Sequence, residues 1–482
     1  MKLNELTALA RRLPPVEITG ITADSRLVKA GYLFAALPGS NIDGRAFIEQ
    51  AVEDGAFAVL ALPGTKASVP VIESEEPRLT LAQIAMRFHA GQPEHVAGIT
   101  GTNGKTSVAR FTSQIWNALG KKAGSLGTLG AVAPGYDYAL RHTTPDPVEI
   151  HQILSTMAAM GTTHLAMEVS SHGLSQHRAD GVSFKYAAFT NITQDHLDYH
   201  PDFRDYFSAK MRLLTELLPV GATAVINADG PGSDRAAEAA VAAGRKVFSV
   251  GRKGKDIVLK QLEATVDGLS MDIQHQGRSY QIALPLIGAY QADNALVAAG
   301  LAIVSGLSAE RVFEQLSSIS AAPGRMQLAG IKRFADGGEA TAYVDYAHTP
   351  DAIATALAAI RPHADGDIHI VFGAGGDRDR TKRPLMAKAA ASAAQHLIIT
   401  DDNPRSEDPA AIRAEVQTGA PSALNIGGRA DAIAAGVAAL KPGDVLLVAG
   451  KGHELGQTIE GVTYPFDDVA TTSRLMAEAS EA

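Results

Sequence analysis

A glycine-rich segment beginning at residue 101 has the composition of a phosphate-binding loop. The segment Gly101-Thr102-Asn103-Gly104-Lys105-Thr106 lies between an apolar run at 95–100, which predicts a strand, and apolar residues at 108, 111, 115 and 119, whose spacing predicts a helix. Glycines let backbone N–H groups approach phosphate oxygens, a helix start favours anions, Lys105 supplies positive charge and Thr106 a magnesium ligand. A strict P-loop has glycine where this chain has Ile99, so a plain strand-to-helix turn is the alternative. The segment predicts ATP or GTP binding.

A carboxylate follows a second apolar run, at 164–169. Glu168 lies near the end of this expected strand, where its side chain could reach the same magnesium ion. A single acidic residue at a strand end is more commonly a solvated surface residue. Both interpretations stay open on composition alone.

Two hydrolase interpretations fail on local sequence. His196 and His200 have the i, i+4 spacing of a zinc site, but Pro201 disfavours helical geometry at His200 and no glutamate follows His196. The Ser-Ser-His triplet at 170–172 has no nucleophile elbow around it. Zinc-dependent and serine-dependent hydrolysis are therefore rejected.

Four polar segments follow four expected strands in the last third of the chain. They are Asp345 to Pro350, Gly375 to Arg380, Asp402 to Arg405 and Gly450 to Glu454. Each alone has the composition of a turn with surface charges. Because the carboxyl ends of parallel strands meet at one edge of an open α/β sheet, the four together predict a ligand-lined edge.

The elements that position these residues alternate between strands and helices. The expected strands are 95–100, 164–169, 186–190, 222–226, 341–344, 368–372, 396–400 and 445–448. Before them lie short apolar runs at 32–37 and 56–62 and a helix at 80–88, and the alanine-rich stretch 387–394 indicates a packed helix. This alternation predicts an α/β fold with mostly parallel sheets and helices on both faces.

Composition narrows the class of protein. At about 150 residues per domain, the 482 residues predict three domains, at 1–93, 94–322 and 323–482. A net charge of −9 argues against a nucleic-acid partner, and the absence of cysteine excludes disulfides, thiolate zinc sites and cysteine nucleophiles. No apolar stretch is long enough for a membrane span and the first residues do not resemble a signal peptide, so a cytoplasmic protein is expected.

Six motifs in this order resemble the Mur ligases of peptidoglycan synthesis. They are Gly-Thr-Asn-Gly-Lys-Thr, Met-Glu-Val-Ser-Ser-His-Gly, Asp-His-Leu-Asp-Tyr-His, Gly-Arg-Met-Gln, Asp-Tyr-Ala-His-Thr-Pro and Gly-Lys-Gly-His-Glu. The resemblance runs from Asp24 to Glu454. It implies a small N-terminal α/β domain that binds the UDP end of the substrate, a central P-loop-type ATP-binding domain and a C-terminal Rossmann-like domain that binds an amino acid. Folylpolyglutamate synthases share the loop and the architecture but not Asp402 to Arg405 in this setting.

Within the family, the resemblance is strongest to members that add 2,6-diaminopimelate to UDP-N-acetylmuramoyl-L-alanyl-D-glutamate. It implies that ATP phosphorylates the free carboxylate of the D-glutamate unit and that the amine of diaminopimelate attacks the acyl phosphate. The tetrahedral intermediate then collapses to amide and phosphate. ATP is the implied co-substrate, Mg²⁺ the implied cofactor, and a monomer is expected.

The resemblance also implies roles for residues at matching positions. The implied ATP-binding residues are Gly101, Thr102, Asn103, Gly104, Lys105, Thr106, Ser107, Asn294, Arg325 and Asp345. The implied magnesium ligands are Thr106, Glu168, His196 and Lys210, the last as a carbamate, with Lys105 also counted among the catalytic residues. Carbamylation converts an ammonium group into an anionic oxygen ligand. By composition alone Lys210 would be a solvated helix residue.

The same resemblance implies two further sets of residues, which bind the remaining two substrates. The muramoyl-dipeptide set is Ser25, Ser40, Asn41, Ile42, His142, Thr143, Thr144, Ser170, Gln176 and Arg178, although relatives often have asparagine in place of His142. The diaminopimelate set is Arg378, Asp402, Asn403, Pro404, Arg405, Gly450 and Glu454. Diaminopimelate carries a distal carboxylate that lysine lacks, which an arginine can bind through two hydrogen bonds. Lysine-adding relatives typically lack arginine at the position of Arg405.

Three alternatives remain. A P-loop kinase or an ATPase motor would use the same loop, but the kinase would release no free phosphate and the motor would need no peptide. A non-catalytic nucleotide-binding scaffold is disfavoured because Lys105, Thr106, Glu168, His196 and Lys210 are all present. A lysine-adding ligase is the third. One departure from many relatives, Ala374 in place of cysteine, has no mechanism attached to it.

Overall fold

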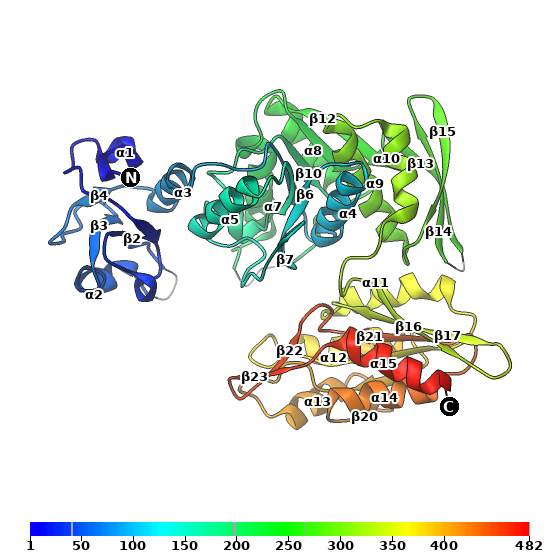
Figure 1. Ribbon diagram of the computed structural model, residues 1–482. Coiled ribbons are helices and arrows are strands. Elements are labelled where there is room, and N and C mark those ends of the chain that lie inside the picture. The colour runs from blue at the N-terminus through cyan, green and yellow to red at the C-terminus, as the bar shows by residue number, and fades with distance from the viewer. Residues whose placement is uncertain (40–41, 196–198, 266, 482) are drawn as a thin grey trace. The chain divides into compact units, whose positions relative to one another are not determined.

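The computed structural model describes residues 1–39, 42–195, 199–265 and 267–481 (Figure 1). The chain divides into two compact units, Met1–Asp256 with Val297–Val312 and Ile257–Leu296 with Phe313–Ala482. Their boundaries cut through α9 (Ala289–Val304) and α10 (Ala309–Gln315). The predicted division into 1–93, 94–322 and 323–482 stays a prediction.

The first ninety residues contain a parallel sheet with strand order β1-β2-β3-β4. The strands are β1 (Gly20–Thr22), β2 (Tyr32–Ala35), β3 (Ala56–Ala61) and β4 (Val71–Glu73), and the helices are α1 (Leu3–Leu6), α2 (Ile48–Glu53) and α3 (Pro77–Phe88). Leu33 and Leu60 pack with α1 and α3, whereas Phe34 and Val59 pack with α2. Alternate residues of each strand therefore fill a separate core on either face. The helix expected at 80–88 begins earlier, because Pro77 occupies its first turn.

The rest of the first unit is built on a sheet with strand order β12-β11-β10-β5-β9-β6-β7-β8. Its strands are β5 (His95–Thr100), β6 (Ala123–Gly127), β7 (Gly130–Ala133), β8 (Tyr136–Tyr138), β9 (His164–Glu168), β10 (Tyr186–Phe189), β11 (Thr223–Asn227) and β12 (Lys246–Gly251). Its helices are α4 (Lys105–Ala118), α5 (Pro147–Ala159), α6 (Ser171–Ser175), α7 (Phe203–Arg212) and α8 (Ser233–Ala242). Pairing is parallel from β12 to β6 and antiparallel at β7 and β8. Six parallel strands, from β12 to β6, thus have their carboxyl ends at one edge, where β5 leads into the glycine-rich loop.

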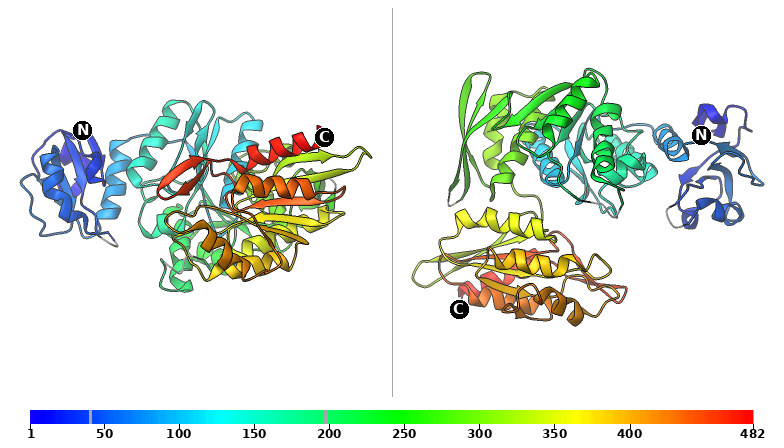
Figure 2. Two further views of the ribbon diagram at one scale, coloured as in Figure 1. Left: turned by 90° about the horizontal axis from the view of Figure 1, so that it is seen from below. Right: turned by 180° about the vertical axis from the view of Figure 1, so that it is seen from behind.

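The second unit contains an antiparallel ribbon of β13 (Ile257–Thr265), β14 (Gly268–His275) and β15 (Arg278–Leu284) (Figure 2). It also contains a sheet with strand order β16-β17-β21-β18-β19-β20. These strands are β16 (Gln327–Arg333), β17 (Glu339–Asp345), β18 (Ile368–Phe372), β19 (His396–Ile399), β20 (Leu424–Asn425) and β21 (Val445–Ala449), with a separate hairpin of β22 (Gly456–Ile459) and β23 (Val462–Pro465). The remaining helices are α11 (Pro350–Ile360), α12 (Lys382–Ala391), α13 (Pro409–Gln417), α14 (Arg429–Ala439) and α15 (Asp468–Glu481).

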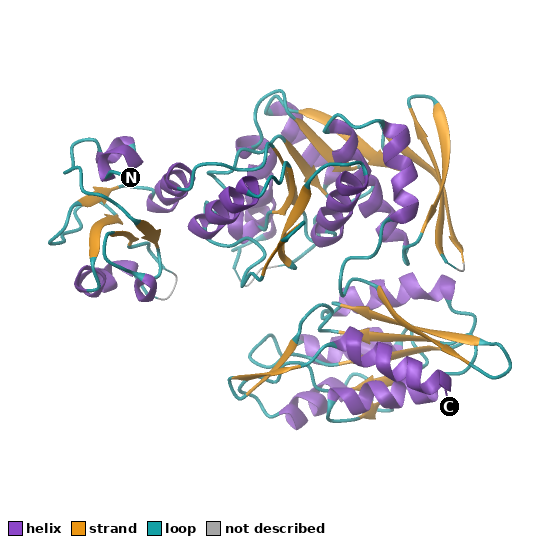
Figure 3. Ribbon diagram, viewed as in Figure 1, coloured by secondary structure: helices purple, strands orange, loops and turns teal. Residues whose placement is uncertain are grey.

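Helices cover both faces of this second sheet (Figure 3). Phe372 and Leu447 pack with residues of α11 and α12, whereas Leu446 and Val448 pack with residues of α14 and α15. The pairing is parallel except between β16 and β17. The prediction of an α/β fold with mostly parallel sheets is confirmed.

Sequence patterns located the parallel strands better than the antiparallel ones. The expected strands 95–100 and 368–372 match β5 and β18 at both ends. The other expected strands differ from the observed ones by one or two residues at one or both ends. Leu119 was expected on the loop helix but lies one residue beyond α4. The ribbon β13–β15 was missed although Leu269, Met271 and Ile273 alternate with polar residues and are buried. Within the described residues, no helix is long and apolar enough to cross a membrane.

A buried ion pair joins two helices of the second unit to its sheet. Arg429 begins α14 and Asp468 begins α15, and both side chains are 0% exposed. Arg429 Nε and Nη2 donate to the two oxygens of Asp468 at 2.6 and 2.7 Å, and Nη2 also donates to the carbonyl of Ala449 at 2.9 Å. The pair therefore fixes the start of both helices against the end of β21.

We expect Arg429→Met to lower the free energy of unfolding by about 3–5 kcal/mol, because it leaves Asp468 buried without its counter-charge. Urea denaturation followed by circular dichroism measures the change. The control is Arg474→Met, which removes a more than half-exposed pair with Glu478 and should cost less than about 1 kcal/mol. If both variants lost the same free energy of unfolding, burial of the Arg429–Asp468 pair would not explain its contribution to stability.

Candidate active site

The glycine-rich loop connects β5 to α4, as the sequence predicts. Gly104 has φ +86° and immediately precedes the helix, and Gly101 has φ +150°. A methyl group on Gly101 would collide with the hydroxyl of Thr190, which follows β10. Lys105 Nζ folds back over the loop and donates to the carbonyls of Gly101 at 3.0 Å and Thr102 at 2.7 Å. The start of α4 thus presents backbone N–H groups beside a lysine, an arrangement suited to phosphate.

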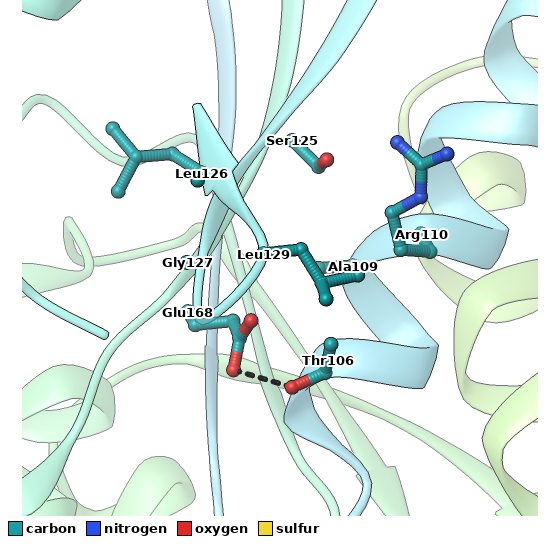
Figure 4. A pocket seen from close by; sticks show the side chains of 9 residues that line it. Thr106, Ala109, Arg110, Ser125, Leu126, Gly127, Leu129 and Glu168 are labelled. Carbon is teal, nitrogen blue, oxygen red and sulfur yellow. Dashed lines mark hydrogen bonds between the residues drawn. The ribbon is translucent and has the colours of Figure 1, made fainter. Parts of the chain in front are cut away.

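Two oxygen-bearing side chains meet directly below this loop. Thr106 Oγ1 donates to Glu168 Oε2 at 2.9 Å, and the two residues are only 6% and 2% exposed (Figure 4). Thr128 holds the other side of the carboxylate through its backbone N–H, at 2.8 Å from Glu168 Oε1. A methyl group on Gly127 would overlap Glu168, so this glycine makes room for the carboxylate. Glu168 is therefore buried beside the phosphate loop, and its interpretation as a solvated strand-end residue is wrong.

The recess beside this pair is lined by α4 and by the β6–β7 turn (Figure 4). Its residues are Thr106, Ala109, Arg110, Ser125, Leu126, Gly127, Leu129, Gly130 and Glu168. Carboxylate and hydroxyl oxygens are the donors that Mg²⁺ prefers. The Thr106 hydroxyl and the Glu168 carboxylate thus fit a magnesium ion by their donor chemistry.

Lys210 lies in the last turn of α7 and is 1% exposed. Its Nζ donates to the carbonyl of Gly101 at 2.7 Å and lies 4.6 Å from the ring centre of Tyr206. Burial and the nearby Lys105 charge hold the pKa of Lys210 well below its usual 10.5, against an opposing effect of Asp195. Lys210 is therefore not a solvated helix residue, and its burial disfavours the charged ammonium form. His196 lies outside the described residues.

Five of the residues expected to bind the muramoyl dipeptide lie in one hydrogen-bonded group. They are Thr143, Thr144, Ser170, Gln176 and Arg178. The last four are joined directly, and Thr143 is joined to them through Thr128 and Glu168. Arg178 donates to the Thr144 carbonyl at 2.8 Å and to Gln176 Oε1 at 2.7 Å, and the Ser170 N–H donates to the Thr144 hydroxyl at 3.0 Å. Thr144 in turn donates to the backbone carbonyl of Glu168 at 3.2 Å. The group is thus connected to the backbone of Glu168 through Thr144, and to its carboxylate through Thr143 and Thr128.

The other expected members of that set lie elsewhere. His142 is exposed, and Ile42 is 61% exposed. Ser25 is half-buried in a short turn, Ser25–Leu27, whose first N–H groups are capped by Asp24. Ser40 and Asn41 lie outside the described residues.

The second unit brings together the three remaining residues expected to bind ATP. Asn294 Nδ2 donates to Gln291 at 3.1 Å, and Gln291 contacts the carbonyl of Arg325 at 3.5 Å. Asp345 accepts from the N–H groups of Met326 at 2.7 Å and Ala347 at 2.9 Å. Burial raises the pKa of Asp345, and the charge of Arg325 opposes this rise. Gln291 was not singled out by sequence analysis.

The four polar segments of the second unit follow β17, β21, β18 and β19, which are adjacent parallel strands. The prediction that they share one edge is therefore confirmed. Arg405 Nη1 donates to the carbonyl of Gly376 at 2.7 Å. A methyl group on Gly375 would lie 2.9 Å from Arg405 Nη1 and 3.9 Å from Arg378 Cγ, so both arginines flank this glycine.

The opposite part of the same edge is acidic. Asn403 Nδ2 donates to Glu454 Oε2 at 2.9 Å. A methyl group on Gly450 would lie 2.5 Å from Asp402 Oδ2. Cations flanking Gly375 and carboxylates near Gly450 form a charge-separated edge, which suits a zwitterionic ligand.

Two buried charged residues that contact this edge were not predicted from the sequence. Arg383 is 0% exposed, and its guanidinium donates to Glu407 at 2.8 Å, to Glu415 at 2.8 Å and to the Gly375 carbonyl at 3.3 Å. Lys451 is also 0% exposed, although its motif was recognised. Their sequence neighbourhoods carry no sign of burial, because the burial comes from elements distant along the chain.

Comparisons with known proteins agree with this geometry. The chain matches three family models, described as the Mur ligase family catalytic domain over 17–89, the Mur ligase middle domain over 99–302, and the Mur ligase glutamate ligase domain over 324–452. The chain belongs to the Mur ligase family. The three matched ranges cover the N-terminal sheet, the loop with Glu168 and Lys210, and the charge-separated edge.

Relatives of this Mur ligase match it over nearly their whole length. A protein of Caulobacter vibrioides is 51% identical over 94% of both chains, and one of Brucella melitensis is 47% identical over 100% of this chain and 99% of its own. Both are named UDP-N-acetylmuramoyl-L-alanyl-D-glutamate–2,6-diaminopimelate ligase. A solved structure of that name has a TM-score of 0.72 at 30% identity over 99% of both chains. MurF from Acinetobacter baumannii, at 18% identity and a TM-score of 0.64, shares the fold.

We expect Glu168→Gln to weaken binding of ADP in the presence of Mg²⁺ by about tenfold to a hundredfold, with little effect when EDTA replaces Mg²⁺. The reason is that the amide keeps the shape of the side chain but loses the charge beside Thr106. Isothermal titration calorimetry measures both affinities. Glu216→Gln, at a half-exposed position paired with Arg212, is the control. An equal loss with and without Mg²⁺ would assign Glu168 to loop structure alone.

Proposed function

We propose that this chain is an ATP-dependent amide ligase of peptidoglycan precursor synthesis. It joins meso-2,6-diaminopimelate to the side-chain carboxylate of the D-glutamate unit in UDP-N-acetylmuramoyl-L-alanyl-D-glutamate. The names of near-full-length relatives at about half identity support the reaction. The observation that carries the choice of amino acid is the placement of Arg378 and Arg405 on one strand edge with Glu454.

The reaction proceeds in two steps. A carboxylate oxygen of D-glutamate attacks the γ-phosphorus of ATP, the bond to the bridging oxygen breaks, and ADP leaves. The amine of diaminopimelate then attacks the acyl carbon, loses a proton, and phosphate leaves as the C–O bond breaks. Because carboxylate and triphosphate repel each other, fixed positive charge and positioning must lower the barrier.

The loop residues Gly101 to Ser107 bind the phosphates in this proposal. Lys105 supplies positive charge, and the N–H groups at the start of α4 point toward anions. Asn294, Arg325 and Asp345 contact the adenine, the nucleotide and the ribose, respectively. Gln291 contacts both Asn294 and Arg325, and Met326, the residue after Arg325, donates to Asp345. These contacts support a shared role in binding the nucleotide.

Thr106, Glu168 and carbamylated Lys210 would hold Mg²⁺, together with His196. When bound, Mg²⁺ neutralises charge on the phosphoryl oxygens. The buried contact between Thr106 and Glu168 supports this ligand set, because both atoms are hard oxygen donors.

The depressed pKa of Lys210 supports its carbamylation. A neutral amine attacks CO₂, a nitrogen–carbon bond forms, and a proton is released to solvent. The product is a carbamate anion in place of the amine. The Lys105 charge, which opposes an ammonium group at this position, favours such an anion.

The muramoyl dipeptide is bound by Thr143, Thr144, Ser170, Gln176 and Arg178, with His142 at the exposed margin. Ser25, Ser40, Asn41 and Ile42 bind the UDP end. The hydrogen bonds that join the first group to Glu168 support delivery of the D-glutamate carboxylate beside the phosphate loop.

Diaminopimelate is bound by the segment Asp402, Asn403, Pro404 and Arg405 together with Arg378, Gly450 and Glu454. Arg405, with Arg378, pairs with the distal carboxylate, and Glu454 with the Gly450 carbonyl accepts from the ammonium group. A site built around a charged group strongly rejects ligands that lack it. We also propose that the enzyme is a cytoplasmic monomer with domains 1–93, 94–322 and 323–482.

The deciding experiment measures phosphate release from ATP with UDP-N-acetylmuramoyl-L-alanyl-D-glutamate. Reactions contain meso-diaminopimelate, L-lysine or no amino acid, and the nucleotide product is identified by mass spectrometry. We expect phosphate to be released, and a tripeptide product to form, only in the reaction that contains diaminopimelate. Release with lysine would keep the ligase and overturn the specificity, whereas release without an amino acid would favour an ATPase.

Lys210→Ala is expected to reduce turnover by at least about a thousandfold, since it removes the anionic ligand. Addition of a small carboxylate such as formate should restore part of the activity, because it supplies the missing oxygens. Alanine substitution at the exposed Lys388 gives the matched control. Undiminished turnover, or a loss that no carboxylate repairs, would discard the carbamate.

Arg405→Ala is expected to raise the KM for diaminopimelate by about tenfold to a hundredfold and to leave the KM for ATP nearly unchanged. Arg405→Lys should recover only part of the loss, since lysine keeps the charge without the paired geometry. Steady-state kinetics with each substrate varied in turn provides the measurement. An unchanged KM for diaminopimelate would refute the role given to Arg405.

A further inference from the structure

A buried lysine lies beneath the acidic part of the amino-acid edge. Lys451 follows β21 by two residues, and its side chain is 0% exposed. Its Nζ donates to Asn403 Oδ1 at 3.1 Å and to Glu454 Oε2 at 3.3 Å. The lysine therefore contacts two side chains that the proposed function assigns to diaminopimelate, without itself reaching solvent.

The contacts of Lys451 determine how its two partners are oriented. Asn403 Oδ1 accepts from Lys451 and from the Thr458 N–H at 2.9 Å, so the amide nitrogen of Asn403 must face Glu454. Glu454 Oε2 consequently receives hydrogen bonds from both Asn403 and Lys451. Among the described residues, no hydrogen bond involves the other carboxylate oxygen, Oε1 of Glu454. That oxygen is available to an ammonium group of a ligand.

Stability alone does not account for a cation at this position. A fully buried charge loses its hydration, and burial of an ion pair is often no better for stability than an apolar replacement. Without the lysine, Glu454 would still contact solvent, because its side chain is 35% exposed, and Asn403 would keep its hydrogen bond from Thr458. Neither residue would be left as an unpaired buried polar group. What the lysine provides is a fixed direction for the carboxylate.

The β22–β23 hairpin holds the same segment from its other side. Gln457 donates to the Asp402 carbonyl at 2.7 Å, and the Arg405 N–H donates to the Thr458 carbonyl at 3.0 Å. Arg405 has φ +55°, a left-handed conformation that non-glycine residues seldom adopt without such support. Asn403 and Arg405 are thus both fixed by contacts outside their own segment, and the lysine completes this framework at Glu454.

We propose that Lys451 is a positioning residue for amino-acid binding. It acts through Glu454 and Asn403, holding Glu454 Oε1 toward the ligand's ammonium group while remaining out of contact with the ligand. The proposal rests on the proposed function of the edge, and it adds a residue that sets the affinity for the amino acid.

The test is a double-mutant cycle with Lys451→Met and Glu454→Gln, read as the KM for diaminopimelate, the KM for ATP and kcat. Lys451→Met should raise the KM for diaminopimelate about tenfold, with less than about threefold change in the KM for ATP. Because both residues act through one carboxylate, the double variant should be little worse than Glu454→Gln alone. Additive effects, or an equal rise in both KM values, would overturn the proposal.

Lys332→Met is the matched control in the same unit. Lys332 is 9% exposed, and its Nζ donates to the backbone carbonyls of Val437 at 3.1 Å and Leu440 at 3.4 Å. Its loss should change thermal stability without changing the KM for diaminopimelate, and it should combine additively with Glu454→Gln. Lys451→Arg keeps the charge and should recover part of the affinity.

Two checks separate the possible failures. If Lys451→Met does not fold, as judged by circular dichroism and by retained ADP binding, Lys451→Gln takes its place in the cycle with the same expected rise in KM. If the unaltered enzyme forms no tripeptide from diaminopimelate, the proposed function fails. If that enzyme is active and the cycle is additive, only the role of Lys451 fails.

Discussion

The convergence of two lysines on one carbonyl oxygen is the interaction on which the first unit's site depends. Lys105 and Lys210 both donate to the carbonyl of Gly101, from α4 and α7 respectively. Two ammonium groups this close oppose each other, and burial adds to the cost for the less exposed one. Burial and the neighbouring Lys105 charge disfavour the charged form of Lys210, and Lys105 is the cation that we propose binds phosphate. The proposed magnesium site and the proposed modification of Lys210 both rest on this arrangement.

A second constraint is shared by both units: parallel strands deliver side chains to one edge. In the first unit, β5, β9 and β10 end at the glycine loop, Glu168 and Thr190. In the second, β17, β18, β19 and β21 end at the segments assigned to nucleotide and amino acid. Loops at such edges vary freely while the strands keep their positions, so one architecture serves ligands as different as a triphosphate and an amino acid.

Sequence alone predicted the architecture and most of the candidate site, for identifiable reasons. The loop, Glu168 and Arg405 sit next to buried strands, whose apolar runs are easily recognised. Long-range packing was not accessible: Glu168 and Lys210 looked like surface residues until the fold enclosed them. The same holds for Arg383 and Lys451, which are charged residues buried by distant partners. The antiparallel ribbon was different, because its alternating pattern was present in the sequence and was overlooked.

The ion pair between Arg429 and Asp468 has a consequence for the order of assembly. Asp468 begins α15, whereas Arg429 contacts the carbonyls of Asp401 and Ala449 beside the amino-acid edge. During synthesis on the ribosome, α14 and the strands of this sheet emerge before α15 does. Until α15 packs, the guanidinium of Arg429 lacks its two hydrogen bonds to Asp468. The packing of α15 is therefore coupled to the conformation of the segments that follow β19 and β21, although α15 contributes none of their residues.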